Sequence, residues 1–269
     1  MRVPSGPLPD RPDRVPLPTT ADGLPALPPE YDAVLDVGLA ALGISLTGEQ
    51  RASIATHLRL LVAWNEHINL TAIHEPAALA RGHILDSLAA VPVLAGRAVR
   101  RLADMGSGGG FPGLPLAVAL PALDVTLIES TRKKARFLAV AAAAAGVMDR
   151  VHVLAERAEA LRLGAAPGIP ADVVTARAVA PLAQLAPIAA DLLVPGGALL
   201  AWKRGDVARE VAAARGALDA AGFGRPQLVP INVPGLDDHR LVVVELEPSR
   251  RRGRRPRATL RPMTPRARS

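Results

Sequence analysis

The sequence of 269 residues predicts an α/β fold in which helices cover a doubly wound, mostly parallel sheet. Three observations support this prediction. Short apolar runs typical of strands alternate with helical patterns through the second half of the chain. A glycine-rich stretch at 104–113 joins a strand pattern to a helical pattern. Two strand-like runs then follow each other directly near the end of this region, which predicts a terminal hairpin.

The composition indicates a globular protein, with 49 % hydrophobic and 21 % charged residues and enough chain to bury a sizeable core. No cysteine is present, which excludes disulfides, thiolate metal sites and a cysteine nucleophile. We expect every apolar run to be shorter than the roughly 20 residues of a membrane span, and the N-terminus lacks the apolar core of a signal peptide. We therefore expect a cytoplasmic protein without a metal site or a membrane contact.

Both ends of the chain are predicted to be disordered. Residues 1–30 contain nine prolines, which predicts a disordered leader. The net charge of +7 is located at the other end, because residues 250–269 hold nine arginines and no acid. The other 249 residues carry 32 − 9 = 23 basic and 25 acidic groups, or −2. We expect 249–269 to be a disordered arginine-rich tail with affinity for polyanions, or else an extension without a specific role.

A small helical cap is predicted over residues 31–95. Apolar residues at helical spacing predict helices over 34–42, 47–64 and 76–94. The second of these begins with Thr47 and Gln50, which have the spacing of a capping box.

The core is predicted over residues 96–248, as alternating strands and helices. The predicted strands are 99–103, 125–129, 151–154, 172–176, 198–202, 227–233 and 239–246. The predicted helices are 114–120, 133–145, 158–163, 182–193 and 207–221.

The glycine-rich stretch fits two different nucleoside ligands. Gly108, Gly110 and Gly113 satisfy the G-x-G-x-x-G pattern of dinucleotide sites. Asp104, Gly106, Gly108 and Gly110 satisfy the D-x-G-x-G-x-G pattern of S-adenosylmethionine sites. The glycines alone leave both ligands open.

Three neighbouring features favour S-adenosylmethionine. Asp104 lies two residues before the first glycine, where a carboxylate suits the cationic amino-acid part of this cofactor and would be repelled by a pyrophosphate. Glu129 ends the second strand, where an acid can accept hydrogen bonds from the ribose of either ligand. The Pro-Gly-Gly turn at 195–197 is similar to the turn before the fifth strand of many class I methyltransferases. An NAD-dependent oxidoreductase and a non-catalytic RNA-binding protein remain the alternatives.

Five blocks of the sequence resemble the small-subunit ribosomal RNA methyltransferase G family, also called the glucose-inhibited division protein B family. The blocks are Trp64-Asn-Glu-His-Ile-Asn-Leu-Thr-Ala72, Arg81-Gly-His-Ile-Leu-Asp-Ser87, 104–115, 129–138 and Ala176-Arg-Ala178. The resemblance covers roughly residues 31–246. It implies a class I S-adenosylmethionine-dependent methyltransferase fold, Rossmann-like with an antiparallel last strand. It also implies methylation of N7 of one guanine in the 530-loop region of 16S rRNA.

The patterns and the resemblance together give the expected site residues. The expected cofactor-binding residues are Asp104, Gly106, Gly108, Phe111, Glu129, Ala158, Glu159 and Arg177. Within this set, the resemblance places Ala158 and Glu159 on the adenine side. Arg177 and Lys203 are candidates for positioning the substrate through a phosphate or guanine O6, although either could be an ordinary solvated cation.

No catalytic residue is assigned, because guanine N7 carries a lone pair and no proton that must be removed. His83 and Asp86 are expected to form a structural pair that fixes the cap, and Asn65 and Asn69 to hold their loop.

The expected partner is 16S rRNA, either within the small ribosomal subunit or within an assembly intermediate, and we expect the protein to act as a monomer. Few aromatic residues are present, so we expect recognition by shape and by phosphate contacts. Candidates for these contacts are Arg132, Lys133, Lys134 and Arg136.

Overall fold

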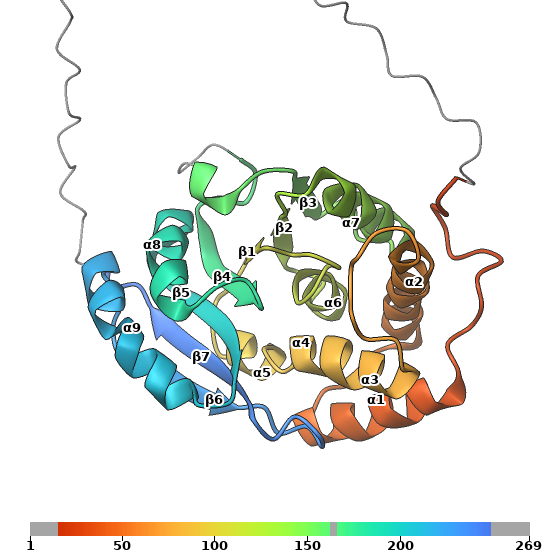
Figure 1. The fold of residues 1–269 in the computed structure, drawn as a ribbon, viewed down its shortest axis with the longest axis horizontal. Coiled ribbons are helices and arrows are strands. Elements are labelled where there is room, and N and C mark those ends of the chain that lie inside the picture. Colours follow the sequence, from red (N-terminus) through yellow and green to blue (C-terminus); the bar gives the residue numbers. More distant parts are fainter. Residues whose placement is uncertain (1–15, 162–165, 249–269) are drawn as a thin grey trace, which may run out of the picture.

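One mixed sheet of seven strands forms the centre of the described chain, residues 16–161 and 166–248 of a computed structural model (Figure 1). The strands are β1 (Arg101–Met105), β2 (Asp124–Ile128), β3 (Val151–Leu154), β4 (Ala171–Arg177), β5 (Leu193–Arg204), β6 (Gln227–Pro230) and β7 (His239–Glu245). Their order is β3-β2-β1-β4-β5-β7-β6. Strands β1 to β5 pair in parallel, whereas β7 pairs antiparallel with β5 and β6. The predicted doubly wound sheet with an antiparallel last strand is confirmed.

Helices cover both faces of this sheet (Figure 1). The N-terminal helical segments are α1 (Pro29–Leu42), α2 (Gly48–Asn65), α3 (Pro76–Leu79), η1 (Ala80–Leu85), α4 (Asp86–Leu88) and α5 (Val91–Ala95). They share one hydrophobic cluster with α6 (Gly113–Ala119) and α7 (Arg132–Ala144) on one face of the sheet. On the other face, α8 (Leu182–Leu192) and α9 (Val207–Ala221) belong to a second cluster.

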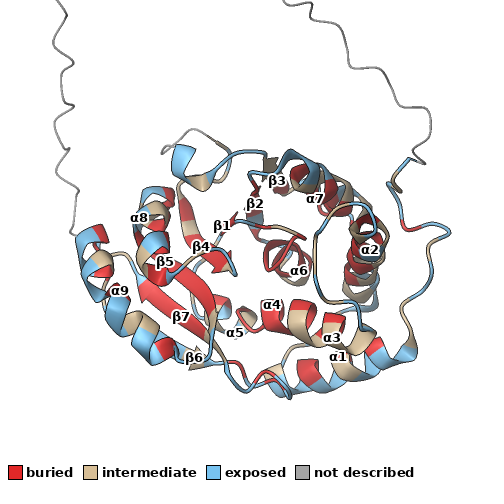
Figure 2. Cartoon of the chain, in the orientation of Figure 1, coloured by how far each residue is buried: buried red, intermediate tan, exposed pale blue. Residues whose placement is uncertain are grey.

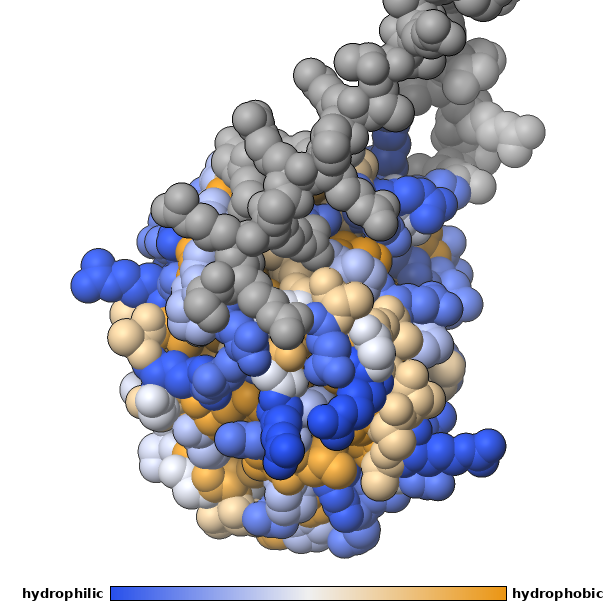
Figure 3. Space-filling model, turned by 90° about the vertical axis from the view of Figure 1, so that its left-hand side faces the viewer, coloured by the Kyte–Doolittle hydropathy of each residue, from blue (hydrophilic) through white to orange (hydrophobic). Residues whose placement is uncertain are grey.

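The two clusters place the core against the sheet, with polar groups turned to solvent. Buried residues concentrate on the strands and on the inward sides of the helices (Figure 2). On the side of the molecule that carries α9, hydrophilic side chains interrupt the apolar ones (Figure 3). This pattern is that of a sheet desolvated on both faces by amphipathic helices.

Several helix ends follow directly from the sequence. The predicted capping box starts α2, because Thr47 Oγ1 accepts from the Gln50 amide and Gln50 Oε1 accepts from the Thr47 amide. Gly43 and Gly222 end α1 and α9 in the left-handed conformation that a residue with a Cβ adopts only at a cost.

The predicted disorder of the leader is wrong for the residues that precede α1. From residue 16 the chain packs against α2, where the Arg59 guanidinium donates to the carbonyls of Ala21, Leu24 and Pro25. The Trp64 indole also donates to the Pro18 carbonyl at 2.8 Å. Prolines prevent regular structure here, but an extended segment can still bury apolar groups and give its carbonyls to side chains. Residues 1–15 and the tail at 249–269 lie outside the described residues.

Several predicted elements differ from the structure. The first helix begins at Pro29 rather than at 34, and the strand predicted at 198–202 extends over Leu193–Arg204, so that residues 195–197 lie within β5 and not in a turn before it. The run at 76–94 is helical but contains one turn of π-helix at Ala80–Leu85. The charged helix expected at 158–163 is reduced to a single 3₁₀ turn, η2 (Ala158–Ala160), before the chain leaves the described residues at 162–165.

One helical stretch, Pro76–Ala95, is long and apolar enough to cross a membrane, contrary to the expectation from the sequence. However, 61 % of its apolar window is buried inside the protein, as in the core helix of a globular domain.

The strand order creates a switch point between β1 and β4. From β1 the chain continues outward to β2 and β3, and then returns to form β4 on the opposite side of β1. The carboxyl ends of the two strands are neighbours, since Met105, the last residue of β1, pairs with Ala176, the residue before the last of β4. In doubly wound sheets, ligands bind at the carboxyl ends of the strands that flank such a point.

Candidate functional site

The glycine turn leaves β1 at this switch point. The amides of Gly106 and Ser107 both donate to the Ile128 carbonyl at the end of β2, at 2.8 and 3.1 Å. Gly106, Gly108 and Gly110 all have positive φ, so the turn could not be built readily from other residues. A Cβ on Gly106 would also lie 2.8 Å from a methyl group of Val179. The turn therefore presents bare backbone to the carboxyl edge of the sheet.

Asp104, on β1 just before the turn, stabilises the turn through hydrogen bonds. Its side chain is fully buried, and it accepts hydrogen bonds from the Thr175 hydroxyl at 2.7 Å and from the Gly113 amide at 3.2 Å. Burial raises the pKa of Asp104 to about 6, partly opposed by these hydrogen bonds. The expectation that Asp104 meets a cationic ligand group does not fit this geometry, because both carboxylate oxygens face the protein interior. Asp104 instead holds β4 and the start of α6 against the turn.

Glu129 lies beside the turn, at the end of β2. Its carboxylate accepts from the Gly108 amide at 3.1 Å and from the Thr131 amide at 2.7 Å. The residue is buried, with 7 % of its surface exposed, whereas Asp104 is fully enclosed. An acid that joins the glycine turn to the start of α7 lies where ribose hydroxyls would approach in this fold.

Phe111 packs behind the turn, between two histidines. Its ring is stacked on His83 with centroids 4.2 Å apart, and it lies 4.9 Å from the ring of His57. Burial lowers the pKa of His57 to about 4, so this ring is neutral near pH 7. His57 Nε2 is 2.8 Å from the Gly109 carbonyl and, because the carbonyl only accepts, must carry the proton. These contacts tie the turn to α2.

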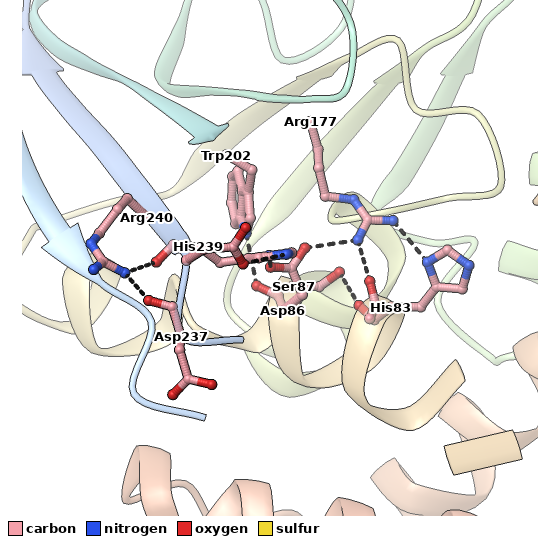
Figure 4. Close-up of polar contacts among 10 residues, drawn as sticks. His83, Asp86, Ser87, Arg177, Trp202, Asp237, His239 and Arg240 are labelled. Carbon is pink, nitrogen blue, oxygen red and sulfur yellow. Dashed lines mark hydrogen bonds and ion pairs between the residues drawn. The ribbon is translucent and has the colours of Figure 1, made fainter. Parts of the chain in front are cut away.

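Arg177 ends β4 and connects the sheet to the π-helical turn η1 (Figure 4). Its Nη1 donates to the Gly82 carbonyl at 2.6 Å and to Asp86 at 2.8 Å, while Nη2 donates to His83 Nδ1 at 2.9 Å. The side chain is only 16 % exposed. Arg177 is therefore not an ordinary solvated cation, because its guanidinium donates three hydrogen bonds within the protein.

The arginine fixes the tautomer of His83. Because Arg177 can only donate, His83 Nδ1 must accept, and the ring proton lies on Nε2, 2.7 Å from the Thr71 hydroxyl. Burial and the nearby Arg177 lower the pKa of His83 to about 3. The expected direct pair between His83 and Asp86 is not formed; Arg177 bridges them instead.

Asp86 joins this network to the C-terminal strands (Figure 4). Its second oxygen lies 2.9 Å from His239 Nδ1 on β7, and its backbone carbonyl accepts from the Trp202 indole of β5 at 2.7 Å. The hydrogen bond to Asp86 raises the pKa of His239. The π turn is thus joined to three strands through one buried carboxylate and its neighbours.

Lys203, the other candidate for substrate positioning, is also held by the protein. Its ammonium donates to the Ala180 carbonyl at 2.8 Å and pairs with Glu210 at 2.7 Å. Glu210 accepts in addition from the Leu182 amide. Lys203 is therefore not an ordinary solvated cation, and its two contacts fix the loop between β4 and α8.

The remaining expected residues lie around the same edge of the sheet. Ala158 and Glu159 form the η2 turn after β3, where Glu159 is exposed. At the start of α7, Arg132, Lys133 and Arg136 are exposed, and Lys134 is partly buried.

The loop after α2 is ordered by one side chain. Asn65 accepts from the amides of Leu70 and Thr71 and donates to the Thr71 carbonyl, as expected. Asn69 is exposed on the same loop, beside a shallow hollow of about 470 Å³.

Several residues of the site gave no signal in the sequence. His57, Thr175, Trp202, Glu210 and His239 lie on separate elements, and each contacts a residue far away in the chain. Among these residues, only Thr175 has a pattern that could have indicated a site, because it is a polar residue near the end of a predicted buried strand.

Comparisons with known proteins identify the family of this chain. The family model described as rRNA small subunit methyltransferase G matches residues 50–231. A Xanthomonas campestris protein named Ribosomal RNA small subunit methyltransferase G is 42 % identical over 219 residues, which are 81 % of this chain and 96 % of that protein. A Sorangium cellulosum protein of the same name is 45 % identical over 203 residues, 75 % of this chain and 82 % of that protein.

Among solved structures, a Nostoc punctiforme protein described as an O-methyltransferase superposes with a TM-score of 0.51. It is 14 % identical, and the match covers 81 % of this chain and 70 % of that one, so the likeness concerns the fold alone. The sheet order and this likeness give the chain the class I methyltransferase fold. The family model matches more than half of the chain, and a relative is 42 % identical over 81 % of it. This chain therefore belongs to the rRNA small subunit methyltransferase G family.

Proposed function

We propose that this protein transfers the methyl group of S-adenosylmethionine to N7 of a guanine in the 530-loop region of 16S rRNA. The observation that carries the proposal is the Glu129 carboxylate, hydrogen-bonded to Gly108 in a glycine turn at the switch point of the sheet. The family to which the chain belongs supports the choice of ribosomal RNA as substrate.

The residues at this edge fit S-adenosylmethionine. The bare backbone of Gly106 and Gly108 allows the cofactor a close approach, and a Cβ at Gly106 would already collide with Val179. Glu129 would accept from the ribose hydroxyls, and Ala158 and Glu159 would lie on the adenine side. The bound cofactor supplies an activated methyl group on a sulfonium.

The chemistry at guanine N7 needs alignment more than acid–base catalysis. The N7 lone pair forms the new C–N bond as the C–S bond breaks, and no proton has to leave the base. The protein must therefore hold the purine with N7 in line with the methyl group and the sulfur, and must prevent orientations in which another atom of the base faces the methyl group. The chain has no cysteine for addition to a pyrimidine, and 175–182 lack the Asn/Asp-Pro-Pro-aromatic motif typical of amine methylation.

Methylation of 16S rRNA with radiolabelled S-adenosylmethionine tests the proposal. We expect label in one nucleotide, at a position where borohydride and aniline cleave the RNA as they do at 7-methylguanosine. Label in an exocyclic amine, in a ribose or at no position would overturn it.

Calorimetric titration separates this function from its rivals. S-adenosylmethionine should bind, and NAD should not. Binding of NAD alone would support the oxidoreductase alternative, and binding of neither would support an RNA-binding protein without catalysis.

The form of the substrate is a separate part of the proposal. We infer that a cytoplasmic, monomeric enzyme acts on 16S rRNA of the small subunit or its assembly intermediate. Since a guanine within folded ribosomal RNA is hard to reach, the form that it methylates is an assembly intermediate or opened RNA. Parallel assays on naked 16S rRNA, free subunits and whole ribosomes decide this point, and equal rates on all three would refute it.

A further inference from the structure

We propose that Val179, on the loop between β4 and α8, is the platform against which the face of the target purine rests during methyl transfer. This inference rests on the proposed function and names the part of the site that receives the base.

The position of the loop is the first argument. It leaves β4 directly after Arg177, at the switch point where the glycine turn leaves β1. A Cβ placed on Gly106 would lie 2.8 and 3.4 Å from the two methyl groups of Val179, so this side chain lies beside the first glycine of the turn, which is itself exposed. A base that receives a methyl group from a cofactor bound on this turn must lie beside the same residue.

The loop is held rigidly on both sides, which is the second argument. Arg177 precedes it with three hydrogen bonds to the π turn. Lys203 binds the carbonyl of Ala180, and Glu210 binds the amide of Leu182. Between these anchors, Ala178 has a φ of +55°, an unfavourable conformation for a residue with a Cβ. Such conformations persist where surrounding contacts impose them, commonly at functional sites.

The third argument is what this rigid loop exposes. The cations on either side, Arg177 and Lys203, are engaged by the protein itself. Val179 is 45 % exposed, although the loop that carries it is fixed by hydrogen bonds on both sides. The other exposed large hydrophobic residues of the described chain lie in α1, in α2, after α7 and in β6, and none of them lies on the loop between β4 and α8.

The chemistry of this surface selects its occupant. An apolar side chain on a fixed backbone cannot form an ionic interaction with a phosphate, but it can pack against the flat apolar face of a base. Contact with one face leaves the purine edge, including N7, free to point at the methyl donor. A rigid platform also limits rotation of the ring out of line, which is the alignment that N7 methylation requires.

Substitution of Val179 by alanine and by isoleucine tests the inference, with Val62→Ala as the matched control. Val62 is also 45 % exposed but lies on α2. Initial rates on the preferred 16S rRNA substrate at saturating S-adenosylmethionine give kcat and KM, while calorimetry gives the Kd of S-adenosylmethionine and thermal unfolding gives Tm.

We expect Val179→Ala to lower kcat/KM for RNA about tenfold, the value of two buried methyl groups. The Kd of S-adenosylmethionine should change by less than about twofold, with Tm unaltered. Val179→Ile should keep the activity, and Val62→Ala should match the unaltered protein.

Unchanged kcat/KM in Val179→Ala overturns the inference. A matching loss of affinity for S-adenosylmethionine also overturns it, because Val179 would then serve only the cofactor turn. If the unaltered protein binds S-adenosylmethionine but methylates no guanine N7, the proposed function itself fails, and this result is distinct from either outcome.

Discussion

At the scale of single residues, burial assigns different roles to two acids beside one turn. Asp104 is fully enclosed, and its two hydrogen bonds organise the protein. Glu129 stands at the edge of the turn, where it bonds two backbone amides while keeping some exposure. The same functional group is therefore enclosed in one place and, in the other, lies at the edge of the turn where we propose that the cofactor binds.

Replacement of Glu129 by glutamine should weaken S-adenosylmethionine binding. A charged acceptor of ribose hydroxyls is removed, which corresponds to about a tenfold to hundredfold rise in Kd. Calorimetry measures Kd, and circular dichroism checks that the fold persists. Glu49→Gln, the same change at an exposed position in the first turn of α2, is the control. Unchanged affinity would show that Glu129 does not face the cofactor.

The stability of the protein should depend on the ionisation of Asp104. Its pKa is about 6 in the folded protein against an ordinary value of 3.8. Between these values the folded state binds more protons, so the free energy of unfolding falls as pH rises from about 4 to about 6. The effect is about 1.4 kcal/mol per unit of pKa difference.

Asp104→Asn provides the comparison, because an amide stays neutral and can still accept from Gly113 while donating to Thr175. Urea unfolding of both proteins from pH 4 to 7 should show the unaltered protein losing stability relative to the variant. Parallel curves would mean that Asp104 ionises at its ordinary pKa.

At the scale of elements, the π turn η1 holds the N-terminal helices to the sheet. Through Asp86 and its neighbours it is joined to β4, β5 and β7. A π turn widens the helix by one residue per turn and brings the carbonyl of Gly82 and the side chain of His83 together at Arg177. The loop that carries Val179 thus receives its position from a helix that is distant in sequence.

Asp86→Asn should destabilise the protein by about 3 kcal/mol, since it leaves the mostly buried Arg177 without its counter-charge. Chemical denaturation measures the change in the free energy of unfolding. Asp36→Asn removes a carboxylate from an exposed pair with Arg51 and should cost less than about 1 kcal/mol. Equal destabilisation in the two variants would mean that the Asp86 network adds little beyond a surface ion pair.

At the scale of the whole molecule, the excess of positive charge and the candidate cofactor site lie in different parts of the chain. Without its last 20 residues the protein is slightly acidic, with 23 basic and 25 acidic groups, and the excess of positive charge lies in 250–269. Affinity for RNA from this segment would come from release of counterions and would carry no sequence information.

Replacement of the nine arginines of 250–269 by glutamine should therefore weaken RNA binding mainly at low salt. The slope of log affinity against log salt should become shallower by about 0.7 for each single-strand phosphate that the tail no longer binds. Affinity for S-adenosylmethionine serves as the internal control and should not change. Identical slopes would show that the tail has no role in binding RNA.

The local features of this protein were predictable because they depend on neighbouring residues. The alternation of strands and helices, the capping box at Thr47 and the glycine turn all reflect spacings within a few positions. The position of Glu129 also followed from local pattern, since the end of a strand after a glycine turn is a defined place in this fold.

The roles of the polar side chains in the site were not predictable in the same way. Arg177, Lys203 and Asp104 look in sequence like ligand-binding groups, yet each has a hydrogen-bond partner inside the protein, 91, 23 and 71 residues away in the chain. Hydrogen bonds at such separations leave no periodic trace in the sequence.

The sequence by itself thus determined the fold class, the family and the edge of the sheet that suits a nucleoside ligand, because short-range patterns specify strands, turns and helix ends. Only the tertiary structure decided which side chains are used as scaffold and which, like Val179, remain exposed at the switch point, because burial and pairing arise from segments that meet only after folding.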